Sequence, residues 1–133
     1  MGRSVAFLLT VKETTDMLFI CYPKCTTCQK AKKWLDEQNI AYTERHIVEA
    51  NPSCEELKAW YQASGLPLKK FFNTSGLLYK EQKLKDRLPE MSEDEQLALL
   101  ATNGMLVKRP LVIAGDTVLT GFKEVEWAEK LAK

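Results

Sequence analysis

The chain has 133 residues, the size of one ordinary domain and too short for two independent hydrophobic cores. Its 19 Lys and Arg residues nearly balance its 18 Asp and Glu residues, so the formal charge of +1 provides no global basic field for nucleic acid. Hydrophobic residues make up 45%, and no apolar run approaches the ~18 residues of a membrane-spanning helix. Four cysteines are too few for a disulfide scaffold, which directs attention to their chemistry.

The first 16 residues differ in character from the rest of the chain. Their only apolar stretch, Val5 to Val11, lacks a cleavage site and is followed by charged residues, which argues against a signal peptide. We interpret residues 1–16 as an extension that carries no function. The domain is expected to occupy residues 17–133.

The next elements alternate between strand and helix. The apolar, β-rich run Leu18–Tyr22 predicts a strand that is buried on both faces. Apolar positions at helical spacing predict a helix over Thr26–Gln38, and Ala41–Val48 predicts a second strand. A β-α-β unit of about thirty residues favours a right-handed parallel crossover.

The middle of the chain is predicted to be helical. Two capping boxes, Ser53–Glu56 and Ser92–Glu95, mark the starts of two helices, and the first of these helices runs to Gly65. Between them, Pro67–Phe72 predicts a short helical turn and Leu84–Leu88 predicts a short helix.

The C-terminal part predicts a hairpin and a helix. Two β-rich segments, Arg109–Ala114 and Thr117–Leu119, flank the turn Gly115-Asp116, and Glu124–Ala132 is amphipathic. The element order is therefore β-α-β, helices, β-β-α. This order predicts an α/β fold with a helical insertion between the second and third strands.

Cys25 and Cys28 form a Cys-x-x-Cys motif between the first predicted strand and the first predicted helix. Cys25 is thereby placed at a helix N-terminus, where unpaired backbone amides and the adjacent Lys24 should lower the pKa of its thiol below the ~8.5 of a free cysteine. We predict that Cys25 is the nucleophile. Cys28, one turn further on, is predicted to resolve a mixed disulfide or a sulfenic acid.

Two other interpretations of the cysteines stay open. Zinc could bind Cys25 and Cys28, but Cys21, Cys54 and His46 do not complete a recognisable ligand spacing, so we expect no metal site. A structural role as buried cysteines suits Cys21 and Cys54 better than Cys25, because a polar loop-to-helix junction is rarely part of a core. His46 is expected to be a surface or partly packed strand residue.

Arg109 and Pro110 form a second informative feature at the start of the predicted hairpin. Folds with this element order place a cis-proline loop here, facing the redox cysteine, although the sequence leaves the isomer open. Arg109 could present its guanidinium to an oxyanion or to the thiolate. An exposed arginine at a strand edge is the alternative.

Three motifs, in this order, resemble those of the glutaredoxin-linked arsenate reductase family and its branch of Spx redox regulators. They are Tyr22–Ala31, Lys69–Gly76 and Leu106–Ile113. The resemblance covers residues 17–133 and looks nearest to arsenate-reductase-like proteins with a Cys-x-x-Cys. It implies a thioredoxin-like fold with a mixed four-stranded sheet.

The resemblance also implies roles for particular residues. Cys25 matches the cysteine that attacks arsenate, and Arg109 matches one of three arginines that hold the oxyanion. The second expected arginine falls near Lys69, and the third falls at or near Gly121. The implied catalytic residues are Cys25, Cys28 and Arg109, and the implied oxyanion-binding residues are Lys24, Lys69, Pro110 and Gly121.

Two functions follow from the resemblance. The first is a cytoplasmic thiol-disulfide oxidoreductase with no bound cofactor, which acts on a small oxyanion or disulfide and is reduced by glutathione, glutaredoxin or thioredoxin. The second is a non-enzymatic redox sensor that binds the α subunit of RNA polymerase through the region 48–53. That region lacks the glycine that such regulators carry. Neither function implies direct binding to nucleic acid or a membrane.

Overall fold

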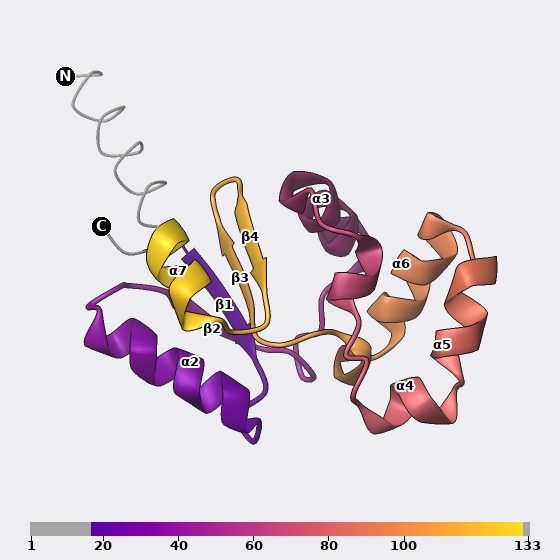
Figure 1. Ribbon diagram of the computed structural model, residues 1–133, viewed down its shortest axis with the longest axis horizontal. Helices are drawn as coiled ribbons and strands as arrows, with labels where there is room; N and C mark the ends of the chain where they lie inside the picture. Colours follow the sequence, from indigo (N-terminus) through magenta and orange to yellow (C-terminus); the bar gives the residue numbers. More distant parts are fainter. Residues whose placement is uncertain (1–16, 132–133) are drawn as a thin grey trace.

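Four short strands and the helices around them make up the part of the chain that the computed structural model describes, residues 17–131 (Figure 1). The elements are β1 (Met17–Cys21), α2 (Thr26–Glu37), β2 (Thr43–His46), α3 (Cys54–Ser64), η1 (Leu68–Phe71), α4 (Leu77–Glu81), α5 (Leu84–Arg87), η2 (Leu88–Glu90), α6 (Glu93–Thr102), η3 (Gly104–Leu106), β3 (Leu111–Ala114), β4 (Thr117–Thr120) and α7 (Glu124–Leu131). The predicted N-terminal extension lies outside the described residues.

The sheet is mixed, with the strand order β2-β1-β3-β4. β1 runs parallel to β2 and antiparallel to β3, and β3 pairs antiparallel with β4. The predicted parallel crossover through α2 and the predicted C-terminal hairpin are both confirmed. β2 begins two residues later and ends two residues earlier than the predicted strand. It ends early because Nδ1 of His46 accepts hydrogen bonds from the amides of Val48 and Glu49, at 3.1 Å each, and the chain turns there.

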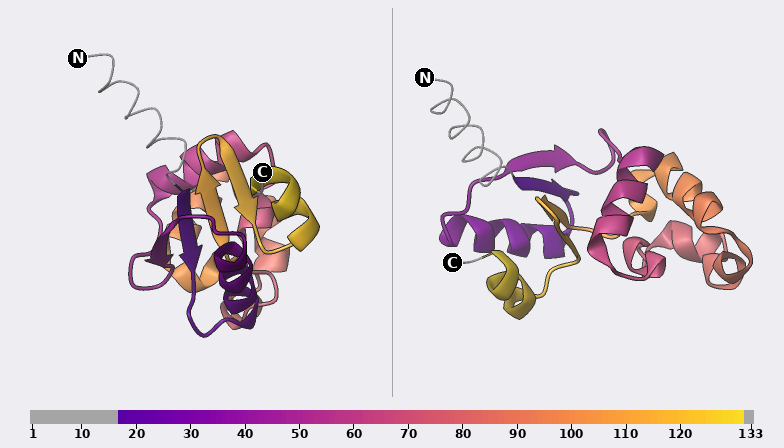
Figure 2. Two further views of the ribbon diagram at one scale, coloured as in Figure 1. Left: turned by 90° about the vertical axis from the view of Figure 1, so that its left-hand side faces the viewer. Right: turned by 90° about the horizontal axis from the view of Figure 1, so that it is seen from above.

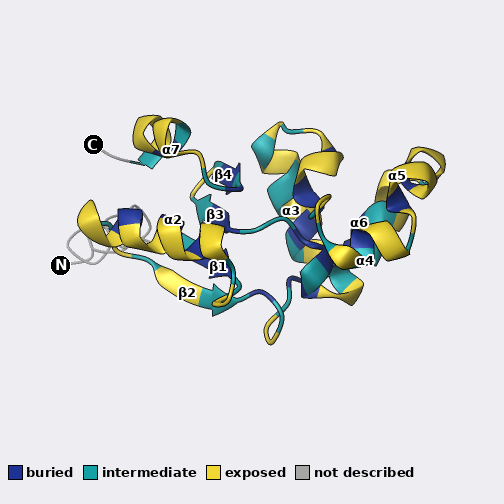
Figure 3. Ribbon diagram, turned by 60° about the horizontal axis from the view of Figure 1, so that its bottom comes forward, coloured by how far each residue is buried: buried dark blue, intermediate teal, exposed yellow. Residues whose placement is uncertain are grey.

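The side chains of β1 alternate between two faces and divide the core in two. Phe19 and Cys21 face α2 and α7, whereas Ile20 faces the helical insertion between β2 and β3. Figures 1 and 2 show α2 and α7 on one side of the sheet and the insertion on the other. We call the first cluster the α2/α7 core; its buried residues are Met17, Phe19, Cys21, Cys28, Ala31, Trp34, Leu35, Val112, Leu119 and Trp127. Buried positions line the inner sides of these elements, while the outer face of α2 is exposed (Figure 3).

Both predicted capping boxes are present in the insertion. The Ser53 hydroxyl accepts a hydrogen bond from the Glu56 amide, and the Glu56 carboxylate accepts one from the Ser53 amide, at 3.1 and 3.0 Å. Ser92 and Glu95 make the same exchange at 3.1 and 2.8 Å. Gly65 then ends α3 in the left-handed region, with φ of 69°.

The short helices of the insertion differ from the prediction. The helices α4 and η3 were not expected from the sequence, and the predicted helix Leu84–Leu88 divides into α5 and η2. The division occurs where Pro89, at the start of η2, supplies no amide hydrogen to continue the α-helical ladder. No helix within residues 17–131 is long and apolar enough to cross a membrane.

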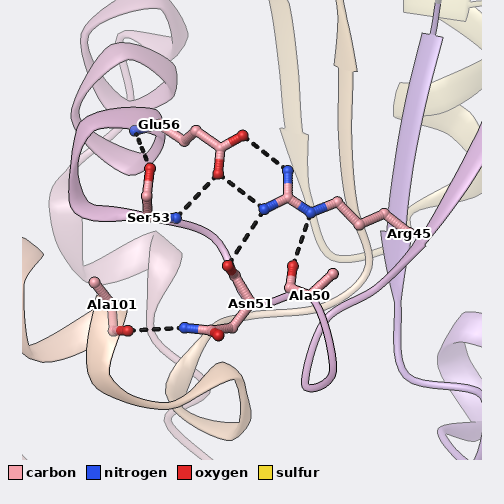
Figure 4. Close-up of polar contacts among 6 residues, drawn as sticks. All are labelled: Arg45, Ala50, Asn51, Ser53, Glu56 and Ala101. Atoms are coloured by element: carbon pink, nitrogen blue, oxygen red, sulfur yellow. Dashed lines mark hydrogen bonds and ion pairs between the residues drawn. The ribbon is translucent and has the colours of Figure 1, made fainter.

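A polar network around Arg45 attaches the start of the insertion to β2 (Figure 4). Its guanidinium makes a two-pronged contact with the Glu56 carboxylate, with both N···O distances at 2.8 Å, and Nε donates to the Ala50 carbonyl at 2.8 Å. Asn51 extends the network, because its side-chain amide donates to the Ala101 carbonyl at the end of α6, at 2.8 Å. The loop after β2 is therefore tied to both long helices of the insertion.

This network predicts an acid-sensitive contribution to stability. Hydrogen bonding to Arg45, opposed by desolvation, lowers the pKa of Glu56 from 4.5 to about 2. The unfolded chain therefore binds more protons than the folded chain between these two pH values, and stability from Glu56 is lost as the pH falls through this interval. Because the Glu56 side chain is 39% exposed, we expect solvent screening to reduce the contribution to about 1 kcal/mol.

Urea unfolding at a series of pH values checks this expectation. The wild type should be more stable than Glu56→Gln, and the difference in their unfolding free energies should have its largest value above pH 4.5. This difference should decrease as the pH approaches about 2. Glu55→Gln is the matched control, because it removes the same charge from the exposed side of the same helical turn. A difference that stays constant across this range would contradict the assignment.

Candidate active site

Cys25 occupies the N-cap position of α2, as the Cys-x-x-Cys motif predicts. Its amide donates to the Tyr22 carbonyl at 2.9 Å, and the Gln29 side chain donates to the Pro23 carbonyl at 2.9 Å, so the loop before the helix is closed. No side chain caps the helix, and its first turn carries no acidic residue. The first-turn amides are therefore available to a thiolate or a bound anion at this end of α2. The side chain of Cys25 is partly exposed, which gives a substrate access to the sulfur.

Cys28 lies one turn further along α2 and is buried. Its sulfur accepts a hydrogen bond from the Tyr22 amide at 3.4 Å. Interaction with the Cys21 thiol and then burial raise the pKa of the Cys28 thiol far above its usual range, while the Tyr22 amide and the Cys25 thiol act in the opposite direction. Cys28 is thus held as a protonated thiol beside the more accessible Cys25.

Cys21, at the end of β1, belongs to this cluster as well. Its thiol donates to the Glu44 carboxylate at 3.4 Å, and Glu44 is paired with Lys32 of α2 at 2.9 Å. The hydrogen bond to Lys32, partly opposed by desolvation, lowers the pKa of Glu44, and the same bond raises the pKa of Lys32. The expectation that Cys21 is simply a packed core residue is therefore incomplete, because its thiol also donates to a carboxylate and shares its core cluster with Cys28.

Arg109, two residues before β3, packs against the loop between β1 and α2. Its guanidinium carbon lies 5.2 Å from the centre of the Tyr22 ring, and the Arg109-Pro110 peptide bond is cis. Two of its nitrogens, Nε and Nη1, are buried without a hydrogen-bond partner. Buried hydrogen-bond donors normally have partners, so the two nitrogens indicate a position for an acceptor. Because the guanidinium is positively charged, an anion is the acceptor that it favours.

Gly121 follows β4 and is held by its own backbone groups. Its amide donates to the Pro110 carbonyl at 2.8 Å, and its carbonyl accepts from the Trp127 indole at 3.1 Å, so both backbone groups are engaged. Its φ of +75° favours glycine, and a Cβ there would lie 3.1 Å from Cε of Lys108. The Lys108 side chain thus passes over the position where the resemblance implies an arginine. Sequence reasoning missed this lysine, although it directly precedes Arg109.

The remaining predicted residues are distributed differently. Lys24 is exposed beside Cys25, whereas Lys69 is exposed in the insertion and lines a pocket there with Tyr61 and Glu93. The lining of that pocket contains no residue of the Cys-x-x-Cys motif. The role of Lys69 in oxyanion binding stays a prediction.

Two further expectations concern the residues outside the motif. The prediction for His46 is confirmed, since its side chain is 27% exposed and packs edge-on against Tyr22. The expectation of a buried Cys54 is wrong, because this residue begins α3 on its solvent side and is exposed. In the part of the chain that the structure describes, no three His, Cys, Asp or Glu side chains are arranged to hold a metal ion.

Comparison with known proteins gives the family of the chain. The model of the ArsC family matches residues 21–130. The uncharacterized protein YusI of Bacillus subtilis is 59% identical over 117 residues, which cover 88% of this chain and 99% of YusI. The global transcriptional regulator Spx of Enterococcus faecalis is 34% identical over 104 residues, which cover 78% of this chain and 77% of Spx.

A solved structure shares the fold. An ArsC family related protein from Bacteroides fragilis is 65% identical and superposes with a TM-score of 0.83, covering 85% of this chain and 95% of that one. The predicted thioredoxin-like fold is thereby confirmed. From the match over residues 21–130 and these identities, the chain belongs to the ArsC family, among relatives that include both arsenate-reductase-like proteins and Spx regulators.

Proposed function

We propose that the protein is a cytoplasmic thiol-disulfide oxidoreductase in which Cys25 attacks the substrate and Cys28 resolves the intermediate. One observation carries the proposal: an accessible sulfur at an uncapped helix N-terminus lies beside a buried second thiol. A thiolate at such a position is stabilised by the helix amides, and a thiol one turn away can reach a mixed disulfide.

The electron balance of the reaction is that of two thiol-disulfide exchanges. The Cys25 thiolate attacks one sulfur of a substrate disulfide, forms a mixed disulfide and releases the other half as a thiolate, which takes up a proton. Cys28 loses its proton and attacks Cys25, which releases the second half of the substrate and forms the Cys25–Cys28 disulfide. The substrate gains two electrons, and an external thiol such as glutathione, glutaredoxin or thioredoxin returns them to the protein.

Arg109 serves a negatively charged substrate in this proposal. Each of its unpartnered nitrogens, Nε and Nη1, can donate a hydrogen bond to an anion, and its position over Tyr22 lies beside the loop that carries Cys25. The substrate class is accordingly a small disulfide that carries a carboxylate, or a tetrahedral oxyanion such as arsenate.

A turnover assay on the purified chain tests the proposal. Protein supplied with glutathione and glutaredoxin, or with thioredoxin and its reductase, should reduce either arsenate or a model disulfide, followed as consumption of NADPH. The protein should also lose two hydrogens in mass under mild oxidation. Failure to reduce both substrates with each reductant would overturn the enzymatic proposal.

The role of Arg109 gives a separate prediction. Arg109→Lys keeps the positive charge but removes the two-donor fork, so KM for an anionic substrate should rise by about tenfold, the loss expected for one charge-assisted hydrogen bond. KM for a neutral disulfide should change little. Arg87→Lys is the matched control, since Arg87 is exposed on the insertion. An equal effect on charged and neutral substrates would contradict an anion-binding role.

The relationship to Spx supports a second candidate function, a redox-sensing regulator that binds RNA polymerase. The corresponding surface would be the loop 48–53, whose backbone is held by Arg45 and Asn51. Calorimetric titration with the α subunit of RNA polymerase tests it. Binding that depends on the oxidation state of Cys25 and Cys28 would favour the regulator, and the absence of binding in both states would exclude it.

A further inference from the structure

We propose that Cys21 is a third redox thiol, which accepts the disulfide formed by Cys25 and Cys28 and stores it as a buried Cys21–Cys28 bond. The inference deepens the proposed function and rests on it at one point, since the Cys25–Cys28 bond must form first. It assigns chemistry to a cysteine that the proposed reaction does not use.

The position of the Cys28 sulfur between the two other thiols is the first support. This sulfur lies 3.4 Å from the amide nitrogen of Tyr22, which is only two bonds from the Cα of Cys21. Backbone geometry therefore places it within about 6 Å of the Cys21 Cα. Cys25 lies one helical turn before Cys28, at the N-cap of the same helix, so Cys28 has a potential disulfide partner in each of the two other thiols.

The burial of the pair is the second support. Cys21 is 3% exposed and Cys28 is 2% exposed, and both belong to the α2/α7 core. Cys25 only packs against the edge of that core and is partly exposed. A disulfide that moves from Cys25 to Cys21 therefore moves from an accessible position to one shielded from external thiols.

Glu44 is the third support, because it supplies a proton acceptor for Cys21. The Cys21 thiol donates to its carboxylate at 3.4 Å. Glu44 lies on β2, opposite Phe19 in the strand register, and therefore on the same face of the sheet as Cys21. Since the Glu44 side chain is 37% exposed and paired with Lys32, a proton that reaches it can pass to water.

The transfer is one thiol-disulfide exchange within the protein. Cys21 gives its proton to Glu44, and its thiolate attacks the sulfur of Cys28. The Cys21–Cys28 bond forms, the Cys25–Cys28 bond breaks, and Cys25 leaves as a thiolate at the N-terminus of α2. The step needs no external oxidant, because the number of disulfides is unchanged. Its result is an oxidised protein whose nucleophile is free again.

Peptide mapping of the whole chain tests the proposal directly. Trypsin separates the cysteines, because Cys21 falls in peptide 13–24, Cys25 and Cys28 fall together in peptide 25–30, and Cys54 falls in peptide 46–58. The Cys25–Cys28 bond is internal to one peptide, whereas the Cys21–Cys28 bond links two. The experiment uses Cys54→Ser protein to exclude the exposed thiol, oxidised with diamide and quenched by acid over time.

The expected result is that the internal disulfide of peptide 25–30 appears first and declines while the link between peptides 13–24 and 25–30 increases. In the same samples, Cys25 should recover its reactivity with iodoacetamide. If the internal disulfide forms but the link never appears, the third-thiol proposal is wrong and the proposed function stands. If neither forms, the proposed function and the inference both fail.

A variant of Glu44 tests the proton step separately. Glu44→Gln removes the acceptor, so transfer should slow by about a hundredfold, the lower end of the effect of a general base. Lys32→Gln is the matched control, since it breaks the same ion pair and retains the carboxylate. Equal slowing in both variants would show that the ion pair, and not the proton acceptor, sets the rate.

Discussion

Replacing Cys25 with serine should eliminate disulfide reduction, with kcat/KM lower by about 10³-fold or more, the size of loss seen when an essential nucleophile is removed. The serine hydroxyl has nearly the same size but does not ionise near neutral pH, so the helix amides have no anion to stabilise. The measurement is the initial rate of NADPH consumption in the coupled assay. Cys54→Ser should retain the full rate, because Cys54 is exposed on α3 and away from the thiol cluster.

The Cys28→Ser variant separates attack from resolution. It keeps the accessible nucleophile but removes the internal thiol, so a mixed disulfide between Cys25 and glutathione should accumulate. Mass spectrometry of the intact protein would show the gain of one glutathionyl group. Rapid turnover by Cys28→Ser at the wild-type rate would instead show that Cys25 works alone with an external thiol.

The second large effect concerns folding, and its site is Gly104 at the start of η3. A Cβ at this buried position would lie 1.8 Å from the Ile47 carbonyl oxygen and 2.6 Å from the carbonyl carbon. These are backbone atoms of the residue that directly follows β2, so they cannot move aside as a flexible side chain would. We expect Gly104→Ala to lower the free energy of unfolding by about 3 kcal/mol or more, at the upper end of overpacking effects.

Urea denaturation followed by circular dichroism measures this loss. Gly65→Ala is the control, because a Cβ there meets nothing within 4 Å and the cost should be only the ~1 kcal/mol of a left-handed φ. A Gly104→Ala protein as stable as Gly65→Ala would show that β2 and η3 can separate without loss. The insertion would then be more loosely attached to the sheet than the structure indicates.

Most of the architecture was predictable because its signals are local. The capping boxes at Ser53 and Ser92, the turn at Gly115 and the periodicity of α2 each act over a few residues, and each was confirmed. The helices α4 and η3 were missed because they have five and three residues and are held by packing and by the Asn103 cap rather than by a periodic pattern.

The site was predictable where sequence neighbours meet and unpredictable where distant residues meet. Cys25 and Cys28 lie on one turn of helix, so their spacing was informative. The hydrogen bond from Cys21 to Glu44 spans 23 positions and depends on the register of β1 against β2. The placement of Lys108 over Gly121 likewise depends on the left-handed backbone after β4, which no residue spacing reveals.

The distribution of tryptophans gives the molecule a built-in optical readout. Trp34 and Trp127 are buried in the α2/α7 core with Cys28, with ring centres 6.0 Å apart, whereas Trp60 packs against the core of the insertion. Indole emission is sensitive to nearby sulfur, so two of the three fluorophores report on the compartment that holds the thiols. A Trp60→Phe protein would confine the signal to that compartment, and the oxidation state of the protein could be followed without any label.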